Sequence, residues 1–118
     1  MSHDCDCNKL YFTRYTDTTH EIYVDGVRLE NYPIFVTYRQ KLVMVVLEHD
    51  SISVTCGEYE GTEEPYTKIE VSLSQEDTAR FREGDVEVQV NWIIDGKRYV
   101  SEIGIAHATR NAQAEVVQ

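Results

Sequence analysis

Apolar and polar residues alternate along much of the chain. Between Val86 and Trp92 every second residue is apolar and the residues between them are polar. A period of two is typical of a β-strand with one buried face. The same pattern recurs in four earlier segments, and a last run of this kind begins with Ile103 and Ile105. The residues expected to face inward in the first run and in the four earlier ones are Ile22, Val24, Ile34, Val36, Tyr38, Ile52, Val54, Ile69, Val71, Leu73, Val86, Val88, Val90 and Trp92.

The segment from Lys41 to Glu48 lacks this alternation. Its sequence, KLVMVVLE, is apolar on both faces, as expected for a strand at the centre of a packed sheet. A buried helix would give a similar apolar run, but the high valine content favours a strand. We therefore expect this segment in the middle of a sheet.

Two Asp-Gly dipeptides predict tight turns. Asp25-Gly26 and Asp95-Gly96 accept the positive φ angles that both central residues of a type I′ turn adopt. Each is therefore expected to join two antiparallel neighbours.

The stretch SQEDTARF, residues 74–81, carries the helical signal of the chain. Ser74 can cap a helix, Asp77 stands three positions later as its reciprocal partner, and Gly84 ends the segment. A helix of about two turns is too short to be stable alone, so it is expected to be a crossover between strands.

Together these elements predict an all-β fold, a single immunoglobulin-like antiparallel β-sandwich with one short helical crossover. A chain of 118 residues has material for one core. Trp92 is expected to anchor this core, although no Cys pair brackets it as in antibody domains. Residues 107–118 lack a clean period, and their conformation stays open between an extended arm and a short helix.

Charge and composition narrow the range of partners. The net charge is -10 at pH 7, whereas nucleic-acid binders need clustered Lys and Arg, so no direct contact with nucleic acid is expected. No apolar run approaches the roughly 20 residues of a membrane span, and the N-terminal sequence lacks the pattern of a secretory leader. The odd count of three Cys favours reduced thiols in a cytoplasmic setting.

Metal-binding residue types cluster near the N-terminus. His3, Asp4, Cys5 and Cys7 can all bind metals, but one chain supplies too few ligands there for a closed tetrahedral zinc site. The other Cys and His residues are distant in sequence: His20, His49, Cys56 and His107. We therefore expect no bound metal and no cofactor. A metal site or an inter-subunit bond at Cys5 and Cys7 stays open.

Neither calcium binding nor catalysis has a specific motif. Four glutamates between residues 58 and 64 offer oxygens to calcium, but without EF-hand spacing, as expected of a solvated loop: Glu58, Glu60, Glu63 and Glu64. Glu48, His49 and Asp50 form the one compact titratable triplet, at an expected hairpin turn. No catalytic residue and no enzyme activity are therefore expected.

A longer pattern covers most of the chain. It consists of a strand PIFVTYRQ carrying Val-Thr-Tyr, a strand ending at Leu73, Ser74-Gln75-Glu76-Asp77-Thr78 closed by Phe81, the turn Gly84-Asp85, the strand VEVQV from Val86 to Val90, the Asp95-Gly96 hairpin, and Ser101-Glu102-Ile103. In these elements the chain, over about residues 20–106, resembles a family of small immunoglobulin-like β-sandwich structural proteins of tailed bacteriophages and prophages.

The resemblance implies a non-enzymatic virion protein: an accessory, decoration or joining subunit of the capsid, neck or tail that acts through protein-protein contacts. The implied partners are phage capsid, neck or tail proteins and copies of the chain in a symmetric assembly, with no membrane. The shared positions look structural, so no catalytic residue is carried over. Because an acidic surface repels encapsidated DNA, we expect the protein outside the shell or along the tail.

This interpretation divides the chain into an N-terminal extension (1–19), a β-sandwich domain (20–106) and a C-terminal arm (107–118). The two ends fall outside the shared pattern and are polar, so they are expected to dock on partners while 20–106 folds alone. The alternative function is a cytoplasmic carbohydrate- or protein-binding β-sandwich module, in which exposed rings among the eight Tyr stack on sugars.

Overall fold

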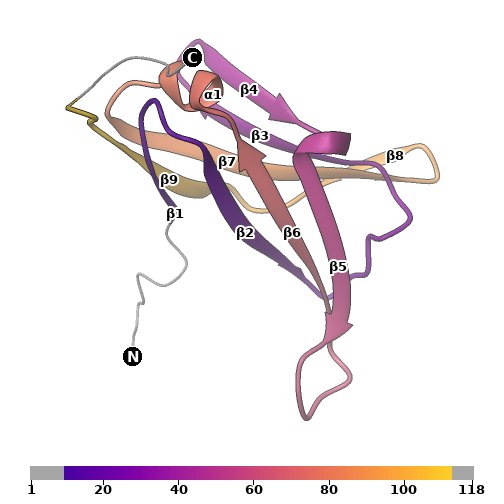
Figure 1. Ribbon diagram of the computed structural model, residues 1–118. Coiled ribbons are helices and arrows are strands. Elements are labelled where there is room, and N and C mark those ends of the chain that lie inside the picture. Colours follow the sequence, from indigo (N-terminus) through magenta and orange to yellow (C-terminus); the bar gives the residue numbers. More distant parts are fainter. Residues whose placement is uncertain (1–9, 113–118) are drawn as a thin grey trace.

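The computed structural model describes residues 10–112, which form a sandwich of two β-sheets (Figure 1). Sheet A has the strand order β1-β9-β7-β3-β4, with β8 also paired to β7, and sheet B has the order β2-β6-β5. The elements are β1 (Leu10–Thr13), β2 (Thr18–Asp25), β3 (Ile34–Gln40), β4 (Val43–Leu47), η2 (His49–Ser51), β5 (Ile52–Glu58), β6 (Pro65–Leu73), α1 (Gln75–Ala79), β7 (Gly84–Ile94), β8 (Lys97–Val100) and β9 (Gly104–Thr109). The fold is the expected immunoglobulin-like sandwich with one short helical crossover.

The chain passes repeatedly between the sheets. The short helix α1 connects β6 of sheet B to β7 of sheet A, and the 3-10 turn η2 connects β4 of sheet A to β5 of sheet B. Pairing among the described strands is antiparallel except between β1 and β9, which run parallel. The sandwich is therefore antiparallel, as predicted, with one parallel pair at the edge of sheet A.

Alternate strand residues form the core between the sheets, and the predicted inward faces of β3 and β6 are confirmed. The predicted face of β7 is confirmed from Val86 to Val90. The buried apolar residues are Phe12, Val24, Leu29, Ile34, Val36, Tyr38, Val45, Leu47, Ile69, Val71, Leu73, Phe81, Val86, Val88, Val90, Ala106 and Ala108. Burial of such side chains is the main favourable contribution to folding.

Trp92 is half-buried at the far end of β7, where it stacks on Tyr99 with ring centroids 6.4 Å apart. It therefore packs against the core without anchoring it, contrary to expectation. Ile22, Ile52 and Val54 are also only partly buried, because they lie on β2 and β5, the two edges of sheet B.

The segment expected at the centre of a sheet is instead the edge strand β4. The tight turn at Lys41 and Leu42 pairs β4 with β3, and the chain then leaves through η2, so the structure describes no strand on the other side of β4. Its outward side chains are apolar but exposed: Met44 is 51% and Val46 is 46% exposed, while Leu42 in the turn is 99% exposed.

The two Asp-Gly turns have different outcomes. Asp95-Gly96 joins β7 to β8 with positive φ at both residues, so this predicted hairpin is confirmed. Asp25-Gly26 does not form a hairpin, because β2 pairs with β6 and the chain after Gly26 crosses to sheet A. The Thr67 hydroxyl guides this crossing, since it donates to the Val27 carbonyl and accepts from the Leu29 amide.

The predicted cap of α1 is confirmed. The Ser74 hydroxyl accepts from the Asp77 amide at 3.1 Å, and the Asp77 carboxylate accepts from the Ser74 amide at 3.0 Å. These reciprocal bonds satisfy amide groups that a helix N-terminus otherwise leaves free.

The last strand has the opposite face inward from the predicted one. Ala106 and Ala108 are buried, whereas Ile103 and Ile105 are 55% and 42% exposed. In the β1–β9 register Ala108 pairs with Phe12, and a small side chain there leaves room for the buried ring.

The sandwich extends beyond the expected range of 20–106 at both ends. Strand β1 contributes Phe12 to the core, and β9 continues to Thr109. The Arg14 side chain also donates to the Phe81 carbonyl beside α1. The expected boundaries are therefore too narrow, because 10–19 and 107–109 include strand residues of sheet A.

Candidate protein-binding groove

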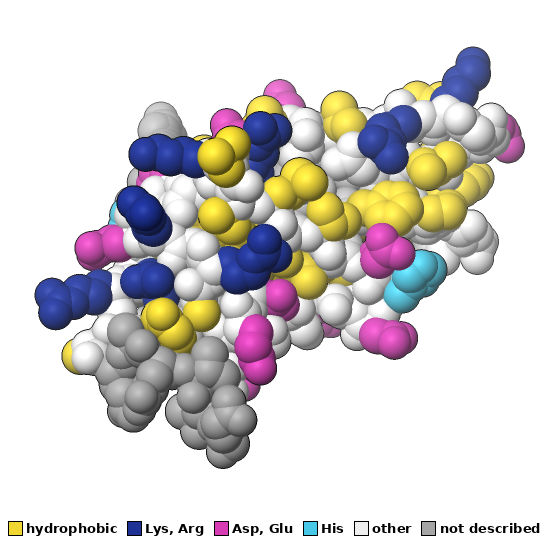
Figure 2. Space-filling model, turned by 90° about the horizontal axis from the view of Figure 1, so that it is seen from above, with side chains coloured by type: hydrophobic (Ala, Val, Ile, Leu, Met, Phe, Trp, Pro, Cys, Tyr) yellow, Lys and Arg dark blue, Asp and Glu magenta, His cyan; other side chains and the backbone are white. Residues whose placement is uncertain are grey.

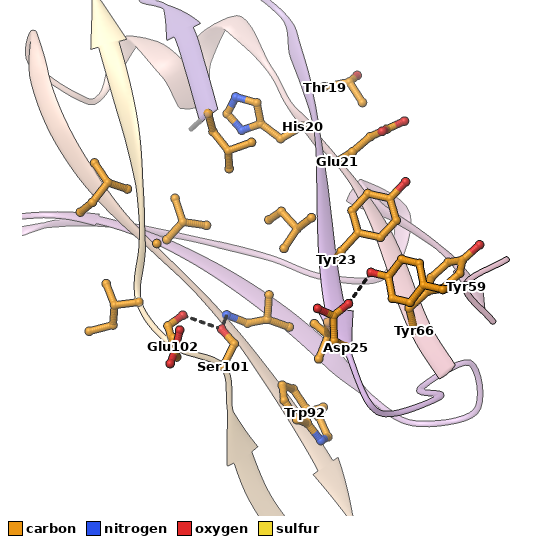
Figure 3. A pocket seen from close by; sticks show the side chains of 18 of the residues that line it. Thr19, His20, Glu21, Tyr23, Asp25, Tyr59, Tyr66, Trp92, Ser101 and Glu102 are labelled. Carbon is orange, nitrogen blue, oxygen red and sulfur yellow. Dashed lines mark hydrogen bonds between the residues drawn. The ribbon is translucent and has the colours of Figure 1, made fainter. Parts of the chain in front are cut away.

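A groove with a volume of about 1520 Å³ lies between the two sheets along one side of the sandwich. One wall is β2, the edge strand of sheet B, and the other is formed by β7 and the segment that connects β8 to β9. Figure 3 shows Thr19, Glu21 and Tyr23 on the β2 wall and Ser101 and Glu102 on the opposite wall.

The groove lies beside a break between β8 and β9, the two successive strands that pair with the same edge of β7. Strand β8 ends at Val100, β9 begins at Gly104, and the residues between them leave the sheet. Ser101 satisfies the backbone of β7 at this break: its amide donates to the Val90 carbonyl at 2.9 Å, and its hydroxyl accepts from the Val90 amide at 3.0 Å. The Gln89 side chain donates to the Ser101 carbonyl at 2.9 Å.

The floor of the groove is apolar. Ile22 and Val24 point inward from β2, and Val88, Val90 and Trp92 come from β7. Val24, Val88 and Val90 are buried, while Ile22 and Trp92 are partly exposed. Apolar surface exposed in a concave site is a common feature of binding grooves.

A buried histidine closes one end of the groove. His20 Nε2 lies 2.9 Å from the Tyr11 carbonyl oxygen, which can only accept, so Nε2 carries the proton. His20 Nδ1 then accepts from the Tyr38 hydroxyl at 2.7 Å. Burial lowers the pKa of His20 below its usual value of 6.5, which keeps the ring neutral, and burial raises the pKa of Tyr38. This network links β1, β2 and β3.

Three tyrosines lie at the other end. Tyr66 lies 4.8 Å from Tyr59 and 5.7 Å from Tyr23 between ring centroids. The Tyr59 hydroxyl donates to the Asp25 carboxylate, and this bond is the main reason that the pKa of Tyr59 rises to about 12. A Cβ at Gly57 would lie only 2.9 Å from the Tyr66 hydroxyl, so the absence of a side chain at this position leaves room for the Tyr66 ring to lie across β5.

The charged residues that line the groove are all acidic. No Lys or Arg is among them, and Lys68, 3.8 Å from Glu21, reaches that carboxylate from outside the lining. The acidic lining residues are Glu21, Asp25, Glu58, Glu60 and Glu102. Carboxylates beside an apolar floor favour a cationic, partly apolar ligand.

The residues singled out for metal chemistry do not converge on this groove. His3, Asp4, Cys5 and Cys7 lie outside the described residues. Glu58 and Glu60 line the groove, while Glu63 and Glu64 are exposed in the β5–β6 loop. Within residues 10–112 no group of three potential metal ligands comes together.

The other candidate residues have ordinary structural surroundings. Cys56 is partly buried with its sulfur 3.5 Å from the Thr67 hydroxyl. His49 lies on η2 with its Nε2 3.1 Å from a Glu48 carboxylate oxygen, and both side chains are exposed. Asp50 is exposed on the same turn.

No protein-family model and no curated protein sequence matches the chain. In the part of the chain that the structure describes, no helix has the length and apolar character needed to span a membrane. Inferences about function therefore depend on the residues and on the geometry of the sandwich.

Sequence reasoning missed the groove as a site. The inward residues of β2 and β7 were predicted, but they were assigned to a closed core. The available signal was Ser101-Glu102-Ile103, where a polar pair breaks the alternation just before an isoleucine. That break coincides with the gap between β8 and β9.

Proposed function

We propose that the protein is a non-enzymatic structural component of a tailed-phage virion. It would be an accessory, decoration or joining subunit of the capsid, neck or tail, and its partners would be proteins of those parts and copies of itself. The observation that carries the proposal is the resemblance over about residues 20–106 described above.

The structure supports this proposal by giving the elements of the resemblance structural roles. Leu73 and Phe81 are buried in the core, and Ser74 and Asp77 form the cap of α1. Ser101 bonds to the backbone of β7 where its partner strand is interrupted. A shared pattern of this kind specifies a rigid sandwich, which suits a subunit that must fit between neighbours.

Exposed apolar side chains support a role in protein contacts. Figure 2 shows hydrophobic side chains spread across the face of the molecule seen from above, with Lys and Arg side chains among them. Strand β4 and its turn contribute Leu42, Met44 and Val46, all of them exposed. Met44 and Val46 stand two residues apart on the same exposed face of β4, and neighbouring exposed apolar side chains are typical of protein-protein contact sites.

The charge supports a position away from packaged DNA. With a net charge of -10, the protein would be repelled by the phosphates of packaged DNA, so we place it outside the shell or along the tail. Assembly would take place in the host cytoplasm.

Co-sedimentation tests the proposal. A lysate containing particles of the phage or prophage that encodes the chain is separated on a density gradient and probed with antibody against the chain. The protein should move with the major capsid protein and stay with the particles after nuclease treatment. Recovery only at the top of the gradient, from a lysate with intact particles, would contradict the proposal.

The tyrosine cluster favours a second candidate, a cytoplasmic carbohydrate-binding module. Tyr23 and Tyr59 are exposed beside Tyr66, and Asp25 and Glu60 lie nearby in the groove lining to accept hydrogen bonds from sugar hydroxyls. Aromatic rings of this kind can stack on sugar faces. A glycan array should then show binding that Tyr59→Ala abolishes, and an array without any binding would remove this candidate.

A further inference from the structure

We propose that the groove binds an extended segment of a partner protein that adds a strand to the free edge of β2. The segment would place apolar side chains at alternate positions into the groove, with Lys or Arg side chains between them. This inference deepens the proposed function by naming the kind of partner and how it is bound, and it rests on that function only in assuming that the partner is a protein.

The first step concerns the backbone of β2. Among the strands that the structure describes, β2 pairs only with β6. The Gly26 amide donates to the Pro65 carbonyl at 2.8 Å, which fixes the phase of the ladder. Because bonded and non-bonded pairs alternate in an antiparallel pair, the even-numbered residues of β2 bond to β6. The amides and carbonyls of Thr19, Glu21 and Tyr23 therefore point toward the free edge.

The second step concerns the side chains beneath this edge. Ile22 and Val24 point into the groove, and Val88 and Val90 face them from β7. A strand added beside β2 would project every second side chain toward this apolar floor, while its backbone bonds to the odd-numbered residues of β2. Backbone bonding and side-chain burial are thus available to one extended segment at the same time.

The third step identifies the charge of the segment. The groove lining contains five carboxylates and no Lys or Arg: Glu21, Asp25, Glu58, Glu60 and Glu102. Complementarity of charge steers a partner to its site and rejects partners of like charge. The first residues of this chain include Asp4 and Asp6, so they match the groove less well than a basic segment of another protein.

The test uses the purified full chain and a labelled synthetic peptide, acetyl-(Lys-Val)₃-Lys-amide, with binding followed by fluorescence anisotropy. The control peptide has glutamate in place of each lysine. The basic peptide should bind at least about tenfold more tightly than the acidic one, because the five carboxylates attract the first peptide and repel the second. A ratio of about tenfold is a modest expectation for five carboxylates. Equal affinities, or no binding of the basic peptide at about millimolar concentration, would overturn the proposal.

A backbone variant tests strand addition itself. Tyr23→Pro removes an amide that faces the free edge, and edge strands tolerate proline at such positions. Its matched control, Tyr23→Ala, keeps the amide and removes the same ring. Peptide affinity should fall about tenfold more in Tyr23→Pro than in Tyr23→Ala. The proline variant loses the hydrogen bond from the amide of residue 23 to the peptide, and its pyrrolidine ring clashes with the added strand. Equal affinities of the two variants would overturn strand addition.

Hydrogen exchange in the wild-type chain provides a second readout that does not depend on the proline variant folding. On adding the basic peptide, amide exchange should slow at Glu21 and Tyr23, while Ile22, already bonded to β6, should change little. Protection elsewhere without protection at Glu21 and Tyr23 would contradict the geometry.

Peptide binding seen only after removal of residues 1–9 would assign the groove to the chain's own N-terminal segment instead. Because purified components are used, these outcomes are independent of whether the protein is found in particles.

Discussion

Truncation of Phe12 to alanine should destabilise the protein strongly, because the structure makes β1 part of the core. Phe12 is only 3% exposed, and its ring centroid lies 5.8 Å from that of Phe81 and 6.1 Å from that of His20. Removing the ring loses about 150 Å² of buried apolar surface, worth about 4 kcal/mol at ~25 cal/mol per Å². This figure agrees with the cost of about 3–5 kcal/mol typical of buried Phe→Ala changes.

Urea denaturation measures this effect directly, and Trp92, the one tryptophan of the chain, supplies the fluorescence signal. With a denaturant slope of about 2 kcal/mol per molar, the midpoint should fall by about 2 M. Tyr11→Ala is the control, because the Tyr11 side chain is 52% exposed and only its backbone carbonyl bonds to His20. That variant should lose less than about 1 kcal/mol.

An unchanged midpoint for Phe12→Ala would refute the assignment of β1 to the sandwich. The same reasoning applies to shortened chains. A chain of residues 20–106 lacks β1 and the end of β9, so it should fail to fold, contrary to the expectation from sequence. A chain of residues 10–112 should unfold cooperatively, and circular dichroism distinguishes the two.

Three further predictions concern other parts of the sandwich. Because the folded state lowers the pKa of His20 from 6.5, the unfolded chain binds a proton that the native state does not, so stability should fall as pH drops below about 6.5. Urea titrations at several pH values should show a weaker fall in His20→Gln, and identical pH profiles would contradict this role of burial. Ser74→Ala should cost about 1 kcal/mol through loss of the helix cap, measured as a lower urea midpoint, and no loss would show that the cap is dispensable. Val88→Asp places an unpaired charge at a buried position beneath the groove and should prevent folding; a well-dispersed NMR spectrum of that variant would contradict the burial of Val88.

The local features of the fold were predictable from sequence. Period-two alternation identified the inward faces of β3, β6 and most of β7, because each of these strands has one face in the core. The cap formed by Ser74 and Asp77 and the hairpin at Asp95-Gly96 also depend on neighbouring residues alone. Such features follow from backbone geometry and short-range hydrogen bonds.

The order of strands in the sheets was not predictable in the same way. The apolar run of β4 indicated a strand but not its neighbours, so Met44 and Val46 were assigned to a sheet interior although both are exposed. Asp25-Gly26 indicated a turn but not the sheet to which the chain turns. These outcomes depend on contacts between segments far apart in the chain.

The candidate groove lies where two strand pairings are absent from the described sandwich, and these pairings also involve segments far apart in the chain. One side of β2 is unpaired, and the partner strand of β7 is broken at Ser101. Ile103 and Ile105 could be identified as apolar, but the exposure of Ile105 follows from the register between β7 and β9, which pairs Ala106 with the buried Val86 and Ile105 with Glu87. Side-chain alternation alone cannot fix that register.

The most direct test of the proposed virion role is a count of copies per particle. Particles of the encoding phage or prophage are purified, and quantitative mass spectrometry with isotope-labelled peptides compares this chain with the major capsid protein. The account predicts a fixed copy number that matches the symmetry of a shell or of a neck or tail ring. Absence of the chain from intact particles, or an amount that varies between preparations, would contradict it.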